Sequence, residues 1–316
     1  MIEKNIPIVI TGATGFLGKY LTQEFLCRGY NVFIISRDLK KAEQVFSGLS
    51  VKALSGSITD AGSLKKIPQY SRVFHCAAIT GAVQASQNSY DEVNVVGTRN
   101  LLEASIGQKA TSFTFVSSVS AVGAVGSLNH PITEQTIADP KTYYGQSKLA
   151  AEKMLLNMAP ASLPITIVRP PLIYGEGQSP TSGVGALLRL CQKSVIPVLG
   201  DLKSQISLAN VNNVASGLID LTFSHSVKEI FNVADSVPYT LKQLSNIMSG
   251  AKRKRFLKIP RSFALIASIP SDGISHLLRR DFGLRSEVIK ALSESGFLMN
   301  IDKALKFGYR PTVTLS

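Results

Sequence analysis

Short apolar runs alternate with segments in which apolar residues recur at helical spacing throughout the first half of the chain. We interpret the short runs, which are bounded by glycine, proline or polar clusters, as buried strands. The predicted strands are residues 6–11, 31–36, 51–54, 72–75, 112–117 and 165–168, and the predicted helices are 18–29, 39–46, 92–105 and 144–158. This strict alternation predicts a doubly wound α/β fold with a parallel sheet, because right-handed crossovers place helices on both faces.

The alternation loosens after Tyr174, where glycine, serine and proline gather in residues 175–185. The shorter elements predicted beyond that point are a helix at 184–192, a strand at 205–208, a helix at 211–223, a strand at 229–233 and a helix at 241–249. We therefore expect a first domain in residues 1–174 and a smaller, discontinuous C-terminal lobe in 175–316. Residues 205–235 are expected to return to the sheet of the first domain.

The first predicted strand runs directly into the sequence TGATGFLG, in which Gly12, Gly15 and Gly18 are spaced three apart. Gly12 permits a tight turn, Gly15 lets backbone amides approach a pyrophosphate, and Gly18 permits close packing of helix on strand. The free N–H groups and the positive dipole end of the next helix favour an anion. The position between strand and helix predicts a Rossmann-type dinucleotide site, with substrate bound by the C-terminal lobe.

The second predicted strand ends in Ser36-Arg37-Asp38, where such folds contact the adenosine ribose. An acidic residue there accepts hydrogen bonds from a 2′-hydroxyl and repels a 2′-phosphate. Ser36 stands at the usual acidic position and Arg37 can pair with a phosphate, so NADP is favoured over NAD as the cofactor. Two alternatives stay open: Asp38 binds the ribose of NAD after a shift of one residue, or Arg37 is a surface charge.

Tyr144 and Lys148 are four residues apart on a predicted helix, which places them on one face. A free phenol has a pKa of about 10, and a neighbouring ammonium is expected to lower the pKa of Tyr144. Tyr144 could then exchange a proton with an alcohol or ketone while hydride moves to or from a nicotinamide. Several hydroxyls follow the strand at 112–117, and one of them could hydrogen-bond the reacting oxygen.

Taken together and in this order, the segments TGATGFLG, SRD, HCAA, NVVGTRNLLEA, FVSSVSAVG, YYGQSK and RPPLIYG resemble the extended short-chain dehydrogenase/reductase family, in its NAD(P)-dependent epimerase/dehydratase group. The resemblance covers nearly the whole chain. It implies an enzyme with Ser118 as the catalytic hydroxyl and Ser117 as the second choice. It assigns Tyr144 as the acid/base and Lys148 as its partner.

The resemblance and the glycine turn together give two sets of candidate residues. The expected cofactor-binding residues are Gly12, Thr14, Gly15, Phe16, Leu17, Gly18, Arg37, Ser57, Ile58, Ala77, Ala78, Asn94, Ser117, Tyr144, Lys148, Pro170 and Pro171. The expected substrate-binding residues are Thr80, Ser118, Ser120, Tyr144 and Leu172. Structural alternatives stay open for Asn94 as a helix N-cap and for the two alanines as packing residues.

Two positions depart from the family pattern. Gly56-Ser57-Ile58 replaces the Gly-Asp pair that often contacts adenine, and Leu172 follows Pro171 where many nucleotide-sugar enzymes have an asparagine that holds the sugar phosphate. Leu172 has no side-chain donor, which weakens the assignment to a nucleotide sugar.

Three functions follow from these residues. The first is hydride transfer at a carbinol or ketone carbon of a nucleotide sugar, by an epimerase, dehydratase or keto-reductase. The second is an NADP-dependent reductase of a less polar ketone or aldehyde, similar to sterol and flavonoid reductases, which Leu172 and the apolar residues 259–269 favour. The third is an NADP-binding sensor without catalysis, against which the retention of Tyr144 and Lys148 argues.

The composition limits which disulfides, metal sites and binding partners are expected. Three widely spaced cysteines and four scattered histidines predict neither a disulfide framework nor a metal site. Residues 241–316 hold 14 Lys and Arg against 5 Asp and Glu, so most of the net charge of +13 lies there, including Lys252-Arg253-Lys254-Arg255. We interpret this run as a solvated basic turn, with contact to a membrane surface as the minor alternative and no nucleic acid as partner.

The location and assembly are also expectations from the sequence. No apolar run reaches membrane-spanning length, and the N-terminus lacks the pattern of a secretory signal, so a cytoplasmic protein is expected. The family resemblance implies a homodimer that forms through the helices predicted at 92–105 and 144–158.

Overall fold

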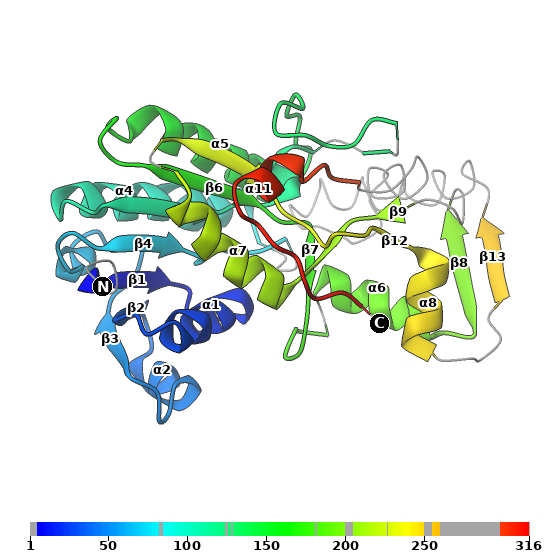
Figure 1. Cartoon of the computed structure of the whole chain (residues 1–316), viewed down its shortest axis with the longest axis horizontal. Helices are drawn as coiled ribbons and strands as arrows, with labels where there is room; N and C mark the ends of the chain where they lie inside the picture. Colours follow the sequence, from blue (N-terminus) through cyan, green and yellow to red (C-terminus); the bar gives the residue numbers. More distant parts are fainter. Residues whose placement is uncertain are drawn as a thin grey trace.

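The computed structural model of the protein describes residues 5–81, 85–123, 126–127, 129–180, 182–199, 205–225, 227–249, 255–259 and 298–315. A seven-stranded parallel sheet forms its centre (Figure 1). In sheet order the strands are β11 (Glu229–Asn232), β6 (Ile165–Arg169), β5 (Ser112–Val116), β4 (Arg72–His75), β1 (Ile8–Thr11), β2 (Val32–Ser36) and β3 (Val51–Ser55). The predicted doubly wound fold is confirmed.

Helices cover both faces of the sheet, as its apolar strands require (Figure 1). One apolar core joins the sheet to α1 (Phe16–Cys27), α2 (Leu39–Val45), α7 (Val211–Phe223) and α11 (Asp302–Lys306). A second core on the opposite face contains residues of the turn η2 (Ser63–Lys66) and of helices α4 (Gly97–Gly107) and α5 (Tyr143–Met158). The aromatic residues Phe25 and Phe74 belong to the first core, and Phe113 and Phe115 to the second.

The helix predicted at 92–105 is longer and less regular than the sequence indicated. It begins with α3 (Gln87–Tyr90), continues as the π-helical turn η3 (Asp91–Val96) and then becomes α4. Single π-turns within helices are uncommon and occur frequently at functional sites. Asn94 lies in this turn, at the level of the strand ends described below.

The remaining described elements form the C-terminal part of the molecule. They are α6 (Gly183–Gln192), α8 (Leu241–Ser249) and three strand pairs: β7 (Leu172–Tyr174) with β10 (Leu208–Asn210), β9 (Gln205–Ile206) with β12 (Tyr239–Thr240), and β8 (Val195–Leu199) with β13 (Arg255–Ile259). The single strand predicted at 205–208 is two strands separated by Ser207, whose hydroxyl accepts a hydrogen bond from Met299 N. The domain boundary at residue 174 stays a prediction.

Buried Asp235 joins the C-terminal elements to the end of the sheet. Its carboxylate accepts hydrogen bonds from the hydroxyls of Tyr174 and Tyr239, over 2.6 and 3.0 Å, and from the backbone N of Asn210 over 2.8 Å. A buried carboxylate with several donors holds separate segments in one arrangement, because leaving it unpaired would be costly.

Two sequence predictions lie outside the described residues. The first concerns the basic run at residues 252–255, of which the structure describes only Arg255. The second concerns the apolar segment at residues 259–269, of which the structure describes only Ile259. Within the described part of the chain, no helix is both long and apolar enough to cross a membrane.

Candidate active site

A cavity of about 690 Å³ opens at the carboxyl ends of β1 and β4. These two neighbouring strands mark the point where the chain reverses its direction of progress across the sheet, since β2 and β3 lie on one side and β5 and β6 on the other. Open α/β sheets bind ligands at this switch point. Of the predicted site residues, the cavity is lined by Gly12, Thr14, Gly15, Phe16, Leu17, Gly18, Arg37, Ser57, Ile58, Ala77, Ala78, Thr80, Ser117, Ser118, Tyr144, Lys148, Pro170 and Pro171.

The glycine turn forms one wall of the cavity, and two of its glycines, Gly12 and Gly18, are required sterically. Gly12 has a φ of +71°, and a Cβ there would lie 2.5 Å from the backbone N of Ala77. A Cβ at Gly18 would lie 2.1 Å from the carbonyl oxygen of Gly12. Gly15 is the N-cap of α1, and no side chain caps this helix. The turn therefore fits a pyrophosphate, which would accept hydrogen bonds from the first N–H groups of α1.

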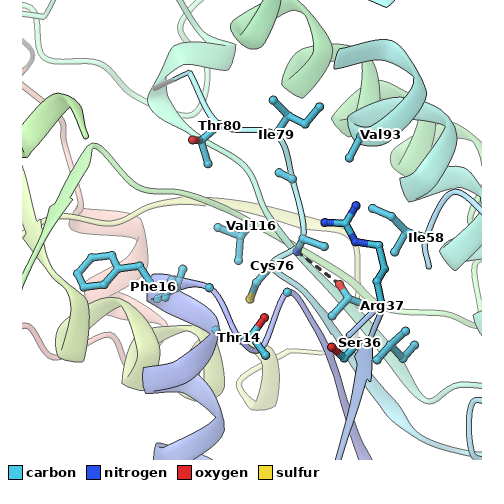
Figure 2. A pocket seen from close by; sticks show the side chains of 18 of the residues that line it. Thr14, Phe16, Ser36, Arg37, Ile58, Cys76, Ile79, Thr80, Val93 and Val116 are labelled. Atoms are coloured by element: carbon cyan, nitrogen blue, oxygen red, sulfur yellow. Dashed lines mark hydrogen bonds between the residues drawn. The ribbon is translucent and has the colours of Figure 1, made fainter. Parts of the chain in front are cut away.

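The end of β2 provides basic groups at the far side of the glycine turn. Arg37 extends from this strand end beside Ile58, and Ser36 lies near its base (Figure 2). Asp38 also lines the cavity, and its carboxylate caps α2 by accepting a hydrogen bond from Lys41 N over 2.9 Å. Lys41, which the sequence analysis did not select, also lines the cavity. Two cations therefore flank the position at which a dinucleotide fold binds the adenosine ribose.

Ser118 and Tyr144 come together at the other end of the cavity. Both residues line the wall, and the Ser118 side chain is close enough to lower the pKa of the Tyr144 phenol. Ser118 precedes the 3-10 turn η4 (Val119–Ala121) and caps it by accepting a hydrogen bond from Ser120 N over 3.1 Å. Tyr144 lies in the first turn of α5, whose N-cap is Thr142. Two local capping interactions thus fix the two hydroxyls relative to their own elements.

Lys148 lies one turn after Tyr144 and is almost fully buried. Its Nζ donates a hydrogen bond to the carbonyl oxygen of Val116 over 2.7 Å and lies 4.4 Å from the centre of the Phe115 ring. The carbonyl and the aromatic face both stabilise an ammonium. The end of β5 therefore holds the lysine from one side while α5 carries it from the other.

Burial controls the titration of both groups. It raises the pKa of Tyr144 to about 12, although a hydrogen bond from the Ser118 side chain opposes the rise. It lowers the pKa of Lys148 to about 8, against the opposing effects of Cys76 and Glu152. The expected lowering of the Tyr144 pKa is wrong for this structure, because desolvation disfavours the phenolate more than its neighbours stabilise it.

Comparison with known proteins identifies the family of this chain. The model of the NAD dependent epimerase/dehydratase family matches residues 8–234. The chain belongs to this family. Its members are NAD-dependent enzymes, so the chain is an enzyme of the epimerase/dehydratase or reductase type, and the predicted resemblance is confirmed.

Relatives within the family differ in their reactions. UDP-glucose 4-epimerase from Vibrio cholerae is 26% identical over 82% of this chain and 80% of its own length. Sterol-4-alpha-carboxylate 3-dehydrogenase, decarboxylating, from Dictyostelium discoideum is 27% identical over 96% of this chain and 95% of its own. The structure of UDP-glucose 4-epimerase from Thermus thermophilus in complex with NAD superposes with a TM-score of 0.73 at 19% identity, covering 98% of this chain and 95% of that one, which shows the shared fold.

Three residues that the family resemblance placed in the site do not line the cavity. The Asn94 side chain is buried and bonds both the N and the O of Ile79, over 2.9 and 3.0 Å, as well as the Ser147 hydroxyl. Ser120 lies within η4, and Leu172 lies on β7 with 39% of its surface exposed. Asn94 therefore fixes the cavity-lining peptide at Ile79 from behind.

Several lining residues were not predicted from the sequence, among them Lys41, Cys76, Ile79, Val93, Val116 and Ile173 (Figure 2 labels four of these). Lys41 had a usable signal, because it lies one helical turn beyond Arg37 in the first turn of α2. The apolar residues carried no signal that separated them from ordinary core positions. Among the described residues, no cluster of His, Cys, Asp or Glu could hold a metal ion.

Proposed function

We propose that this family member catalyses NADP-dependent hydride transfer at a carbinol or ketone carbon, with Tyr144 as the acid/base and Ser118 and Lys148 as the other catalytic residues. One observation carries the proposal. Ser118 and Tyr144 line the same cavity as the glycine turn, which is the wall suited to a dinucleotide pyrophosphate. A proton donor and a hydride carrier would therefore meet in one cavity.

The titration of Tyr144 favours reduction of a ketone. A bound nicotinamide would supply or accept the hydride. Because its pKa is raised to about 12, Tyr144 is protonated at neutral pH and can donate its proton to a ketone oxygen as the carbonyl carbon is reduced. Ser118 would donate a hydrogen bond to the same oxygen and so hold it beside the phenol. Lys148 would place its positive charge at the end of β5, where it stabilises charge that develops at the reacting groups.

The choice of NADP rests on the end of β2. Arg37 and Lys41 line the cavity and can both pair with a 2′-phosphate. Ser36 replaces the acidic residue that would repel such a phosphate, and the Asp38 carboxylate is engaged as the N-cap of α2. NAD, which relatives of known structure bind, is the alternative cofactor.

A nucleotide sugar is the first candidate substrate, in keeping with relatives such as the UDP-glucose 4-epimerase. A less polar ketone or aldehyde is the second candidate, and one observation of the cavity favours it. Phe16, Ile79, Val116 and Ile173 give the cavity an apolar lining. The sterol-4-alpha-carboxylate 3-dehydrogenase matches the chain over nearly its full length and is consistent with this second class.

Two measurements test the proposal. Purified protein should bind NADPH, and a Tyr144→Phe variant should bind it equally well but lose turnover of the substrate by at least about 100-fold. Full turnover by this variant contradicts the role of Tyr144. Nicotinamide that stays bound through gel filtration indicates an epimerase, which recycles its cofactor, whereas free exchange of NADPH indicates a reductase. Tight NADPH binding with no turnover of either substrate class would indicate a sensor instead.

We also propose the homodimer that the sequence indicated, with α4, α5 and η3 at the interface. Val96 and Ala150 are exposed on these elements, and apolar residues on an outer helical face favour association. Sedimentation analysis tests it: a monomer at micromolar concentration would contradict the dimer. The cytoplasmic location and the minor alternative of membrane-surface contact stay predictions.

A further inference from the structure

Glu152 and Arg169 form an ion pair next to the catalytic groups. Arg169 Nη2 donates to Glu152 Oε2 over 2.5 Å, and Arg169 Nε donates to Glu152 Oε1 over 2.9 Å. The Glu152 side chain is 2% exposed and the Arg169 side chain is 5% exposed. Glu152 lies on α5 one turn beyond Lys148, and Arg169 is the last residue of β6, directly before Pro170 and Pro171 on the cavity wall.

The pair also reaches the end of β5. The Ser117 hydroxyl donates a hydrogen bond to Glu152 Oε1, and Ser117 is the neighbour of Ser118 in sequence. Backbone bonds complete the connection, since Ser117 N donates to the carbonyl oxygen of Val168 over 2.8 Å and Val119 N donates to that of Pro170 over 2.9 Å. One carboxylate therefore joins α5, the end of β5 and the end of β6, which are the elements that carry Tyr144, Ser118 and the proline wall.

Stability alone is a poor explanation of this pair. Removing two charges from water is expensive, and buried ion pairs can often be replaced by apolar residues with no loss of stability. Within the described part of the chain, Arg169 Nη1 is also buried without a hydrogen-bond partner, which adds to the cost. A costly pair that touches three elements of the site suggests a role in arranging that site.

We infer that Glu152 and Arg169 are positioning residues, which fix the Ser118 end of β5 against the face of α5 that carries Tyr144 and Lys148. This inference rests on the proposed function. Neither residue lines the cavity, so each acts through its neighbours. Glu152 and Arg169 hold Ser117 and the proline wall in place by hydrogen bonds, and Glu152 contributes a negative charge next to the catalytic lysine.

The charge of Glu152 has a consequence that can be measured directly on Lys148. Burial lowers the pKa of this lysine to about 8, and Glu152 and Cys76 oppose the lowering. The other groups near Lys148 are neutral His75 at the end of β4 and the Phe115 ring on β5, and the charge of Glu152 is itself paired with Arg169 at the end of β6. Removing the Glu152 charge therefore lowers the pKa of Lys148 further, and the lysine loses its proton at a lower pH.

The decisive variant replaces the pair with apolar side chains of similar length, Glu152→Met with Arg169→Met. It leaves no buried charge unpaired, so it is expected to fold. Lysine-selective 13C NMR of the full chain follows the Lys148 Cε signal during a pH titration, and Lys148→Arg identifies that signal. Thr222→Val is the matched control, because it removes a buried hydrogen bond of 2.7 Å between Thr114 on β5 and Thr222 on α7, away from the cavity.

We expect Glu152→Gln, which removes only the negative charge, to titrate Lys148 at a lower pH than the native chain. We expect the double variant to lower kcat roughly 10- to 100-fold with a smaller change in KM. Glu152→Asp, which keeps the charge, should restore the Lys148 titration, and Thr222→Val should leave both readouts unchanged. A folded double variant with native Lys148 titration and native kcat would overturn the inference.

Should the double variant fail to fold, Glu152→Gln and Ser117→Ala are measured in the same NMR titration. An unchanged Lys148 pKa in Glu152→Gln would overturn the inference equally. Full activity of Tyr144→Phe would remove the proposed function but would leave the Lys148 titration as a valid test.

Discussion

A Cβ on Gly145 would lie 2.3 Å from the carbonyl oxygen of Ser120. Gly145 follows Tyr144 in the first turn of α5, and Ser120 lies in the turn η4 that follows Ser118. The hydroxyls of Ser118 and Tyr144 can approach each other because the backbone of α5 rests directly on this turn. A single glycine thus allows the contact on which the proposed chemistry depends.

Gly145→Ala is expected to separate α5 from η4. Because the clash is with a backbone atom, the strain cannot be relieved by rotating a side chain, and we expect a loss of about 1–3 kcal/mol in the free energy of unfolding together with a lower kcat. Urea unfolding and turnover measure the two effects. Gly107→Ala is the control, since a Cβ there meets nothing within 4 Å in helix α4. Equal behaviour of the two variants would show that the contact at Ser120 is unimportant.

Gly12→Ala tests the glycine turn. The added Cβ would lie 2.5 Å from Ala77 N at a φ of +71°, so we expect loss of NADPH binding, measured by fluorescence. Gly48→Ala provides the comparison, because Gly48 has a similar φ of +75° but nothing within 4 Å. It should lose a similar amount of stability from backbone strain and bind NADPH normally. Native NADPH affinity in Gly12→Ala would contradict the assignment of the pyrophosphate site.

Arg37→Ala tests the choice of cofactor. Loss of a charged hydrogen bond to a 2′-phosphate should weaken NADPH binding by roughly 10- to 100-fold and leave NADH binding nearly unchanged. Lys41→Ala should act in the same direction with a smaller effect. Lys40→Ala, at an exposed neighbour that does not line the cavity, is the matched control. A native chain that binds NADH more tightly than NADPH would rule out the preference for NADP.

The buried imidazole of His75 is expected to make the free energy of unfolding depend on pH. It is buried between the hydroxyls of Thr11 and Thr98, and burial, with a smaller contribution from the charge of Lys148, lowers its pKa to about 3. Between pH 3 and the ordinary value of about 6.5 the unfolded chain binds more protons than the folded one, so the free energy of unfolding falls as the pH falls.

A His75→Asn variant should flatten this dependence between pH 6.5 and 4 by up to about 1.4 kcal/mol per pH unit. Urea unfolding at several pH values measures the slope. His130→Asn, at an exposed position, should leave the native slope unchanged. An unaltered slope in His75→Asn would show that another group controls acid unfolding.

Local sequence patterns were sufficient to predict most strands of the central sheet. The strands of residues 72–75 and the helix of 211–223 have the predicted bounds, because apolar periodicity and turn residues act over only a few positions. The short strands β7, β8, β12 and β13 were not predicted. Strands of two to five residues form where a partner is supplied from elsewhere in the chain, and no local pattern records that partner.

The residues of the candidate site likewise divide into those that the sequence alone identified and those whose position depends on tertiary contacts. Gly12 and Gly18 were recognisable because a positive φ at Gly12 and close backbone packing at Gly18 both favour glycine, and Tyr144 and Lys148 because helix geometry places them on one face. Asn94 was assigned to the cavity but is turned away, since its amide bonds Ile79 and Ser147 instead. Hydrogen-bond partners distant in sequence decide where a polar side chain points.

By itself the sequence determined the fold class, the family and the glycine turn, because each depends on residues that are close along the chain, and it supplied the proposal that Ser118, Tyr144 and Lys148 are the catalytic groups. Only the tertiary structure decided the protonation of those groups, the placement of Lys41 on the cavity wall and the pairing of Glu152 with Arg169. Desolvation and charge pairing depend on which segments pack together, and a phenol expected to have a lowered pKa has a raised one because the folded chain removes it from water.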